Sequence, residues 1–488
     1  MASAPSAPSA PSAPSAAPAS SAARLRTDLR AILDAPSVAH AHIGVLVTSL
    51  LTGETLFAQR ERQLFVPASN QKMLTAAVAA RKLGWDYRFT TRVLATGPVR
   101  ADGRLDGDLI VVGGGDPTIN PRHPDRWAAL DRWAAAIAAR GVRIVGGHLI
   151  GDDNAFAEPG WGSGWSWDDL AAGYGAPIGA LQYHEDEVEV MVGPGMTAGA
   201  PAVILLSPYG SGLLVDNQAI TVAEGQPTRL AVERMPGSIF LTVRGQVAAG
   251  APARTLAASV DNPTRLFVNA FREALERHGV AVAGSAVDID EADAVPDVSK
   301  AVVWIEDRSA PLYEIVDVLL KWSRNEYGET LLWALTPPGQ PASEAAGLRV
   351  LRESLTGDFG LEPGSFGAFD GSGLSRYDMV SPDAFVRLLT AIWHDPPMLG
   401  PFRSALPVAG RSGSLESRMT GTPAEGRVWA KTGSMFNIRS VSGYLLTADE
   451  EPLAVSLLAN TYTVPSAEIE RLMDDVLVAL ARFSRTTR

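Results

Sequence analysis

The segment FVPASNQKMLTAAVAARKLG places Ser69 three residues before Lys72, at the start of a run with helical character. Residues three apart on a helix lie on the same face, so the serine hydroxyl and the lysine amine are expected to meet there. A buried lysine with a lowered pKa can take the serine proton, and a helix N-terminus favours the negative charge that develops. The alternative is an N-capping serine beside a lysine whose amine reaches solvent.

A second motif pairs two polar residues in an apolar setting. Ser323 and Asn325 flank one residue in VLLKWSRNEYGETLLWAL, where the spacing of apolar residues predicts a helix from Ala310 to Leu335. A buried polar group without a partner costs roughly 1–3 kcal/mol, so these side chains need either a function or local partners. The alternative is a helix break with side-chain-to-backbone hydrogen bonds.

The third motif, Lys431–Ser434, lies in RVWAKTGSMFNIRSVSGYL on a strand predicted over Val428–Thr432. Gly433 has no side chain, so a ligand can approach the backbone of that strand closely. The alternative is an ordinary strand end with a turn glycine. Each motif alone is weak, and the order of the three along the chain carries more information.

A Ser-x-x-Lys near the start, a Ser-x-Asn on a helix and a Lys-Thr-Gly on a strand near the end form the set found in penicillin-recognising serine enzymes. The chain resembles the D-alanyl-D-alanine carboxypeptidase/endopeptidase family, the class C low-molecular-mass penicillin-binding proteins, which carry a large insertion between the first two motifs. Here 250 residues, 73–322, separate Lys72 from Ser323. The likeness covers about residues 25–485 and includes segments 113–120, 146–156, 165–181, 369–382 and 406–419.

The resemblance implies a serine-type mechanism. Ser69 attacks the carbonyl of the penultimate D-Ala, with Lys72 as the base. Ser323 relays the proton toward the leaving D-Ala amine, and Lys431 supplies positive potential around that relay. A water then releases the acyl-enzyme. No cofactor or metal is implied, and the sequence contains no His-Glu-x-x-His motif.

The same resemblance implies contacts with the substrate. Backbone N–H groups of Ser69 and Ser434 form the oxyanion hole, and Asn325 holds the amide on the acyl side. The hydroxyls of Thr432 and Ser434, on either side of Gly433, bind the terminal carboxylate.

Two residues in the similar segments, Asp152 and Arg376, are candidates for binding the free end of a diamino acid in the stem peptide. The alternative is that Asp152 caps a turn and Arg376 makes a surface ion pair. The expected partners are peptidoglycan stem peptides as substrates and β-lactam antibiotics as covalent inhibitors. Such partners imply a periplasmic or other extracytoplasmic location.

The sequence departs from the family pattern at two places. His184–Asp186 stand where members usually read Asn-x-Asn, which alters the junction into the innermost insertion. After Lys-Thr-Gly the chain continues Ser434-Met435-Phe436, where the family often has Thr/Ser-Leu and sometimes a polar residue. The second departure bears on preference for the acidic side chain of the substrate.

The implied fold class is α/β (α+β): a penicillin-binding/β-lactamase-like transpeptidase domain, an antiparallel sheet flanked by helices, with large β-rich inserted domains. Helical spacing is present at 25–35, Asn70–Leu83, Pro382–Trp393 and 467–483, and hairpins are predicted at 42–60 and 440–462. Residues 92–300 are dense in short strands, interrupted by one predicted helix at 265–279.

These patterns predict four parts of the chain. Residues 1–23 form a disordered Ala/Pro/Ser tether. The catalytic domain comprises 24–91 plus 300–488, the inserted domain II comprises 92–181 plus 264–299, and the nested domain III comprises 182–263. The tether has no basic or apolar segment, so it is not itself an export signal.

Composition excludes several other classes of protein. The chain has 488 residues, enough to bury a core, and no run approaches the ~18 apolar residues of a membrane helix. Its net charge of −12 argues against nucleic acid as a partner. It has no cysteine, which excludes disulfides, thiolate metal sites and cysteine nucleophiles.

Three other functions remain open at this point. A β-lactamase or esterase uses the same motifs, although the long insertion argues against it. A D-aminopeptidase-like acyl hydrolase shares the fold and differs in the polarity of its pocket. An inactive cell-wall-binding scaffold has no need of Ser69, Lys72, Ser323 and Lys431 together.

Overall fold

A computed structural model describes residues 21–208, 210–292 and 298–486. Strands from both ends of the chain form one five-stranded antiparallel sheet in the order β19-β20-β21-β1-β2. Its strands are β1 (His42–Ser49), β2 (Thr55–Gln59), β19 (Val428–Met435), β20 (Ile438–Leu446) and β21 (Pro452–Asn460). Strand β21 is buried from Leu453 to Asn460 and is apolar there except at Ser456 and Asn460, as expected of a strand covered on both faces.

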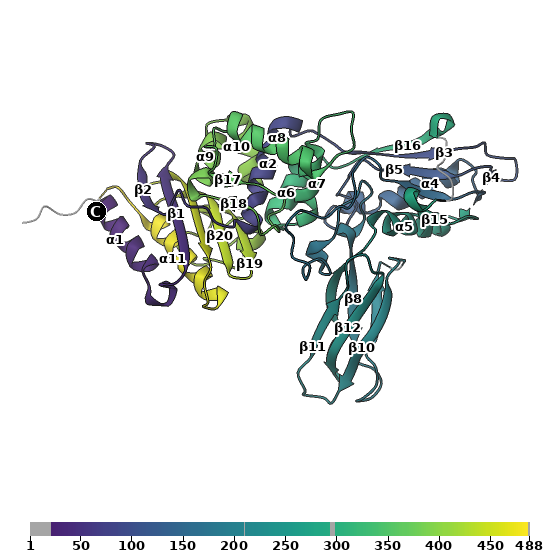
Figure 1. The fold of residues 1–488 in the computed structure, drawn as a ribbon, viewed down its shortest axis with the longest axis horizontal. Coiled ribbons are helices and arrows are strands. Elements are labelled where there is room, and N and C mark those ends of the chain that lie inside the picture. The colour runs from purple at the N-terminus through teal and green to yellow at the C-terminus, as the bar shows by residue number, and fades with distance from the viewer. Residues whose placement is uncertain (1–20, 209, 293–297, 487–488) are drawn as a thin grey trace, which may run out of the picture.

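Helices cover the two faces of this sheet (Figure 1). Helices α1 (Ser21–Leu33) and α11 (Ser466–Arg482) pack together on one face, and α9 (Pro382–Trp393) packs on β1 and β21 from the other. The layer of α9 also contains α2 (Gln71–Leu83), α6 (Leu312–Lys321), α7 (Asn325–Ala334), α8 (Glu344–Gly357) and α10 (Pro396–Ala405). This antiparallel sheet between helical layers confirms the predicted fold class.

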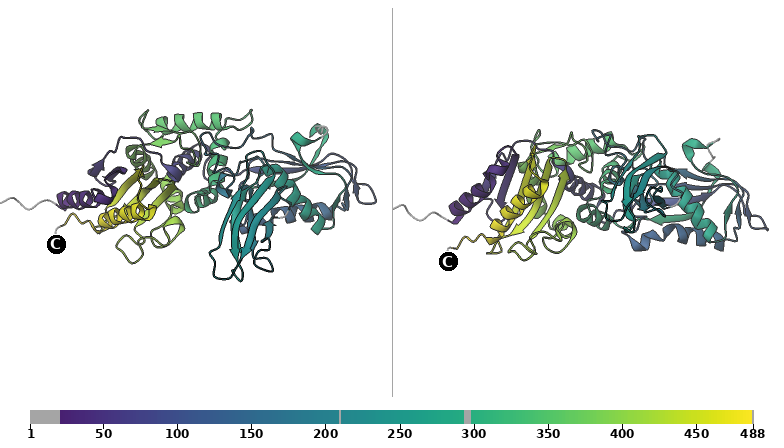
Figure 2. Two further views of the ribbon diagram at one scale, coloured as in Figure 1. Left: turned by 60° about the horizontal axis from the view of Figure 1, so that its bottom comes forward. Right: turned by 90° about the horizontal axis from the view of Figure 1, so that it is seen from below.

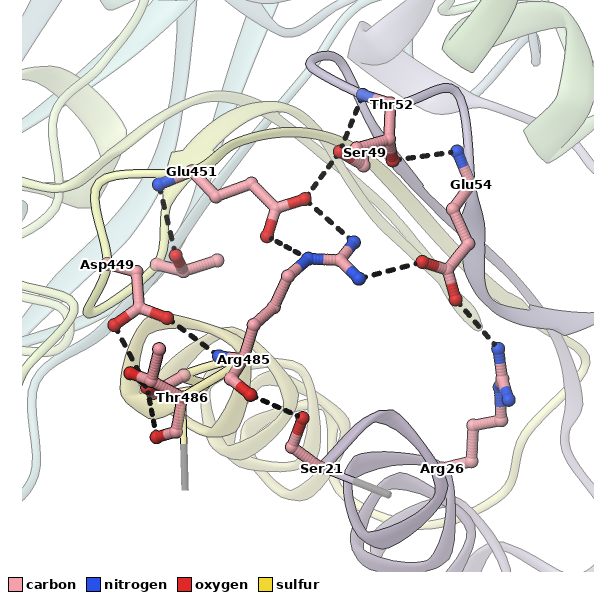
Figure 3. Close-up of polar contacts among 11 residues, drawn as sticks. Ser21, Arg26, Ser49, Thr52, Glu54, Asp449, Glu451, Arg485 and Thr486 are labelled. Carbon is pink, nitrogen blue, oxygen red and sulfur yellow. Dashed lines mark hydrogen bonds and ion pairs between the residues drawn. The ribbon is translucent and has the colours of Figure 1, made fainter. Parts of the chain in front are cut away.

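Both ends of the described chain meet beside β1 and β2 (Figure 3). The guanidinium of Arg485 lies 2.7 Å from the carboxylate of Glu451 and 2.8 Å from that of Glu54. Ser49 donates a hydrogen bond to Glu451 at 2.5 Å, and Ser21 donates to the carbonyl of Arg485 at 3.2 Å. These contacts join α1, the β1–β2 turn and the C-terminal segment.

A second sheet is built from the inserted part of the chain, in the order β15-β7-β5-β3-β16. Its strands are β3 (Thr90–Ala95), β5 (Leu109–Val112), β7 (Leu149–Asp152), β15 (Ala286–Asp288) and β16 (Val302–Arg308). Helices α4 (Ala129–Ala139) and α5 (Pro263–Arg277) share a core with it. The prediction of a single helix in residues 92–300 is therefore wrong, because α4 also lies there and buries Trp133 and Ile137.

The boundaries of the insertion also differ from the expected ones. Strand β16 pairs antiparallel with β3, so residues 302–308 belong to the inserted sheet rather than to a catalytic part that resumes at residue 300. Because β3 starts at Thr90, the chain leaves the helical layer of the catalytic part, after α2, near residue 90 and returns to that layer after Arg308. The predicted tether lies outside the described residues except for 21–23, which begin α1.

Two three-stranded sheets form the nested part, in the orders β13-β8-β9 and β10-β12-β11. Their inward side chains, such as Val190, Leu241 and Val243, share one core. Figure 1 shows these strands projecting from the rest, and in both views of Figure 2 the inserted part and the first sheet lie at opposite ends of the long axis. The strands are β8 (Glu187–Gly193), β9 (Val203–Ser207), β10 (Leu214–Val222), β11 (Arg229–Glu233), β12 (Phe240–Ala248) and β13 (Arg254–Ser259).

The remaining elements are short: α3 (Pro124–Trp127), β4 (Arg104–Leu105), β6 (Ile144–Val145), β14 (Ala281–Val282), β17 (Phe366–Gly367) and β18 (Met379–Val380). Among the described residues, no helix has both the length and the apolar character needed to cross a membrane.

Candidate active site

A cavity of about 530 Å³ lies where the first sheet, the helical layer and the insertion meet. It is open to solvent and lined by polar and apolar side chains from all three. The lining residues are Ser69, Asp168, Asp169, Tyr174, Ser323, Asn325, Gly373, Leu374, Arg376, Ser434, Met435 and Phe436.

The start of helix α2 places Ser69 and Lys72 together, as the sequence predicts. Ser69 lies in a short 3-10 turn before the helix, and Lys72 is fully buried in its first turn. The Nζ atom of Lys72 is 2.9 Å from Ser69 Oγ, 2.6 Å from Asn325 Oδ1 and 2.7 Å from the carbonyl oxygen of Ser372. Two of these three partners can only accept.

This geometry selects a direction for proton transfer. A neutral amine has two N–H groups and one lone pair, and the two carbonyl oxygens of Asn325 and Ser372 take both N–H groups. In that neutral state the lone pair is left for the Ser69 hydroxyl, whereas the protonated amine donates its third N–H to Ser69 Oγ. The neutral amine is thereby oriented to remove the serine proton.

The electrostatic surroundings favour that neutral amine. Burial lowers the pKa of Lys72 to about 7, against the opposing effect of the carboxylates of Asp370 and Glu329. Glu329 also accepts hydrogen bonds from the backbone N–H groups of Gly371 and Ser372, at 3.0 and 2.8 Å. The acid that stands near Lys72 thus also fixes the Ser372 peptide whose carbonyl oxygen binds the amine.

The Ser-x-Asn motif does not lie within one helix. The predicted helix Ala310–Leu335 is broken into α6 and α7 at residues 322–324, and Ser323 has a left-handed φ of 60°. The break turns the Ser323 hydroxyl toward Lys431, whose Nζ lies 2.8 Å from Ser323 Oγ. Burial and the neighbouring Lys72 lower the pKa of Lys431 well below its usual range.

Asn325 connects the base to the inserted part of the chain. Its Oδ1 accepts from Lys72, and its Nδ2 donates to the carbonyl oxygen of Tyr174 at 2.8 Å. Both ends of the amide are therefore held, which fixes its orientation.

The residues near the end of β19 differ in whether they face the cavity. Ser434 lines the cavity, whereas the Thr432 hydroxyl is 2.6 Å from that of Ser414 and is not among the lining groups. A Cβ atom on Gly433 would lie 2.2 Å from Ser440 Oγ and 2.7 Å from the carbonyl oxygen of Pro67. The side of Gly433 on which a Cβ would stand therefore faces Ser440 on β20 and the loop that carries Ser69, which explains why a residue without a side chain is needed there.

Of the two residues expected to bind the stem peptide, Arg376 and Asp152, only Arg376 lies at the cavity. Arg376 lines the cavity, and Asp152 does not: its Oδ1 accepts from the backbone and side chain of Asn154, at 3.2 and 3.0 Å. The acids at the cavity are Asp168 and Asp169 instead. They were missed, although they stand in the segment 165–181 that resembles the family, and two adjacent acids there were the available signal.

One group of carboxylates in the described part of the chain has the spacing of metal ligands. Oxygens of Asp153, Glu158 and Asp288 lie within 4.8 Å of one another. Asp153 already accepts from Thr264, and Asp288 accepts from Asn262 at 2.7 Å. None of the three acids is among the residues that line the Ser69 cavity.

Comparison with known proteins identifies the family. A model described as the D-Ala-D-Ala carboxypeptidase 3 (S13) family matches residues 25–481. The chain belongs to this family. The match confirms the family expected from the three motifs and, with it, the enzyme class, a serine-type D-alanyl-D-alanine carboxypeptidase.

Individual members of the family are similar to this chain over most of its length. A D-alanyl-D-alanine carboxypeptidase of an Actinomadura species is 36% identical over 475 residues, 94% of this chain and 85% of the relative. The carboxypeptidase DacB of Haemophilus influenzae is 24% identical, covering 88% of this chain and 87% of the relative. The crystal structure of penicillin-binding protein 4 from Haemophilus influenzae superposes with a TM-score of 0.79 at 23% identity, over 94% of this chain and 99% of that one, which shows that the fold is shared.

Proposed function

We propose that this chain removes the terminal D-alanine from peptidoglycan stem peptides through an acyl-enzyme on Ser69. The observation that supports this most strongly is the buried Lys72 amine, whose Nζ lies 2.9 Å from Ser69 Oγ and within hydrogen-bond distance of the carbonyl oxygens of Asn325 and Ser372. A serine hydroxyl beside a neutral amine is an activated nucleophile at neutral pH.

In the first step Ser69 Oγ attacks the carbonyl carbon of the penultimate D-Ala, and its proton passes to Lys72 Nζ. The oxyanion that forms is stabilised by the backbone N–H groups of Ser69 and Ser434, two residues that line the cavity. Collapse of this intermediate breaks the peptide bond and leaves an ester on Ser69.

The leaving nitrogen needs a proton when the bond breaks. The Ser323 hydroxyl, 2.8 Å from Lys431 Nζ, lies in the same cavity as Ser69 and relays a proton to the departing D-alanine amine. It donates its own proton to that nitrogen and regains one from Lys72, which becomes neutral again. Water then attacks the ester while the neutral Lys72 takes its proton, and Lys72 returns that proton to Ser69 Oγ as the ester bond breaks.

The far side of the cavity suits the free end of a diamino acid in the stem peptide. Arg376 offers a guanidinium for a carboxylate, and Asp168 and Asp169 offer carboxylates for an ammonium group. Tyr174 donates from its hydroxyl to Asp169 at 2.7 Å, which orients that acid. Removing the free amine from a substrate by acetylation is expected to raise KM, and Asp169→Asn is expected to remove that difference.

Peptidoglycan as substrate places the protein outside the cytoplasm, and β-lactams, which mimic the D-alanyl-D-alanine end, are the expected covalent inhibitors. The direct test is release of D-alanine from a stem pentapeptide by the wild-type protein and by Ser69→Ala. Release by the wild type alone supports the proposal. A β-lactamase would hydrolyse penicillin rapidly without releasing D-alanine, and a scaffold would do neither.

A further inference from the structure

We propose that Arg324, held by Glu185 and Glu187 of the nested insertion, positions Ser323 and Asn325 for the reaction. The inference rests on the proposed function. It concerns a residue that does not line the Ser69 cavity and acts through its two neighbours in the chain.

The side chain of Arg324 is enclosed by carboxylates from the insertion. Its guanidinium forms ion pairs with Glu185 and, at 3.1 Å, with Glu187. The Glu185 side chain is only 6% exposed and that of Arg324 20%, so water weakens this interaction little. The residue between the two motif side chains is thus attached to a different part of the fold.

Glu185 also holds the residue on the other side of Ser323. Its second carboxylate oxygen pairs with Arg122, and the guanidinium of Arg122 lies 5.4 Å from the centre of the Trp322 ring. One carboxylate therefore connects to both Trp322 and Arg324. Between them Ser323 adopts its left-handed φ of 60°, a conformation that a serine keeps only when its surroundings impose it.

The backbone that presents Glu185 is itself in an uncommon conformation. His184, Glu185 and Asp186 have φ values of 56°, 60° and 53°, which residues other than glycine seldom adopt in succession. The turn is held by the N–H of His184 donating to Ile119 O and by the N–H of Val260 donating to Asp186 O, at 3.2 and 3.0 Å. A strained turn that its surroundings hold in place is typical of a functional element.

Several acidic side chains lie near the positive charge of Arg324. Burial raises the pKa values of Glu326 and Asp186 well above their usual range. Three of their buried oxygens, both of Glu326 and Oδ2 of Asp186, have no hydrogen-bond partner in the structure. The carboxylates that form ion pairs with Arg324 are those of Glu185 and Glu187.

Arg324 also acts electrostatically on the base. Its positive charge lowers the pKa of Lys72, while Asp370, Glu329 and Asp378 raise it. A neutral side chain in place of Arg324 should therefore shift the pH at which Lys72 loses its proton upward.

The test compares acylation by a fluorescent penicillin in full-length variants. Glu185→Gln is expected to slow acylation by about tenfold to a hundredfold, because small displacements of Ser323 and Asn325 misplace the reacting groups. Glu189→Gln is the matched control, since Glu189 lies four residues further along the chain than Glu185, on β8, and is exposed. It should acylate like the wild type.

A pH profile separates positioning from general loss of structure. In Arg324→Gln the rise of the acylation rate with pH should move to higher pH. Arg324→Lys should keep the wild-type midpoint and have a lower rate, because lysine keeps the positive charge but cannot reproduce the contacts of the guanidinium with both carboxylates. Thermal unfolding identifies variants that fail to fold, and then Glu185→Asp replaces Glu185→Gln with the same expected direction.

Equal acylation rates for the Glu185 variant and Glu189→Gln, with an unchanged midpoint in Arg324→Gln, would overturn the inference. A wild-type protein that penicillin does not label at all would instead overturn the proposed function.

Discussion

The pKa of Lys72 makes acylation strongly dependent on pH. Only the neutral amine can take the Ser69 proton, and burial lowers its pKa to about 7. The neutral fraction is then about one half at pH 7, about one tenth at pH 6 and about one hundredth at pH 5. The acylation rate should therefore fall about tenfold per pH unit below 6.5 and level off above pH 8.

The assay is the second-order rate of labelling by a fluorescent penicillin between pH 5 and pH 9. Lys72→Arg serves as the companion variant, because a guanidinium stays protonated over this whole range and should leave the protein nearly inactive at every pH. A wild-type rate that stays constant from pH 5 to pH 8 would refute the reasoning, as would wild-type acylation in Lys72→Arg.

The same pKa predicts a stability effect of known sign. The lysine is protonated below pH 10.5 in the unfolded chain and below about pH 7 in the folded one. Between these values the unfolded state binds more protons, so this group adds stability as pH rises, by about 1.4 kcal/mol per pH unit. Urea unfolding of Lys72→Met from pH 7 to pH 9 should lack this slope relative to the wild type, and equal slopes would contradict the shifted pKa.

Three further changes test other parts of the structure. Asn325→Ala removes the acceptor 2.6 Å from Lys72 Nζ and should slow acylation about a hundredfold without changing the unfolding temperature; near-normal acylation would contradict its placement. Gly433→Ala should slow acylation more than tenfold by pushing β19 away from Pro67, while Gly400→Ala, with open space around it, should not. Arg485→Ala should lower the free energy of unfolding by about 1 kcal/mol at pH 7. Because Arg485 lowers the pKa of Glu451, that loss should disappear as acid protonates the carboxylate, and a loss that is the same at pH 7 and pH 3 would exclude the ion pair as its cause.

Local spacing was sufficient to predict the parts of the site that lie within one element. Ser69 and Lys72 are separated by less than one helical turn, and Lys431 lies on the strand predicted over Val428–Thr432, so their sequence pattern predicts their placement. Strand β19 continues to Met435 and therefore also includes Ser434, which lies beyond the predicted strand. The sheet shared by the two chain ends was predictable because its hairpins and the terminal helix have clear apolar periodicity.

Other features depend on contacts between distant residues. No proline or glycine lies at 322–324, so the apolar spacing predicts a continuous helix, and the break at Ser323 becomes visible only with Lys431 and the partners of Arg324 in place. The filled space at Gly433 depends on Pro67, far away in the sequence. The two acids of segment 165–181 reach the cavity because the insertion folds back onto the helical layer, which no local pattern expresses.

The central claim is that Ser69 is the nucleophile, and mapping of the covalent adduct tests it most directly. After incubation with fluorescent penicillin and digestion, mass spectrometry should find the label on the peptide that contains Ser69, and the Ser69→Ala protein should carry none. Label on a peptide that contains another serine such as Ser323, or label that persists in Ser69→Ala, would contradict the account.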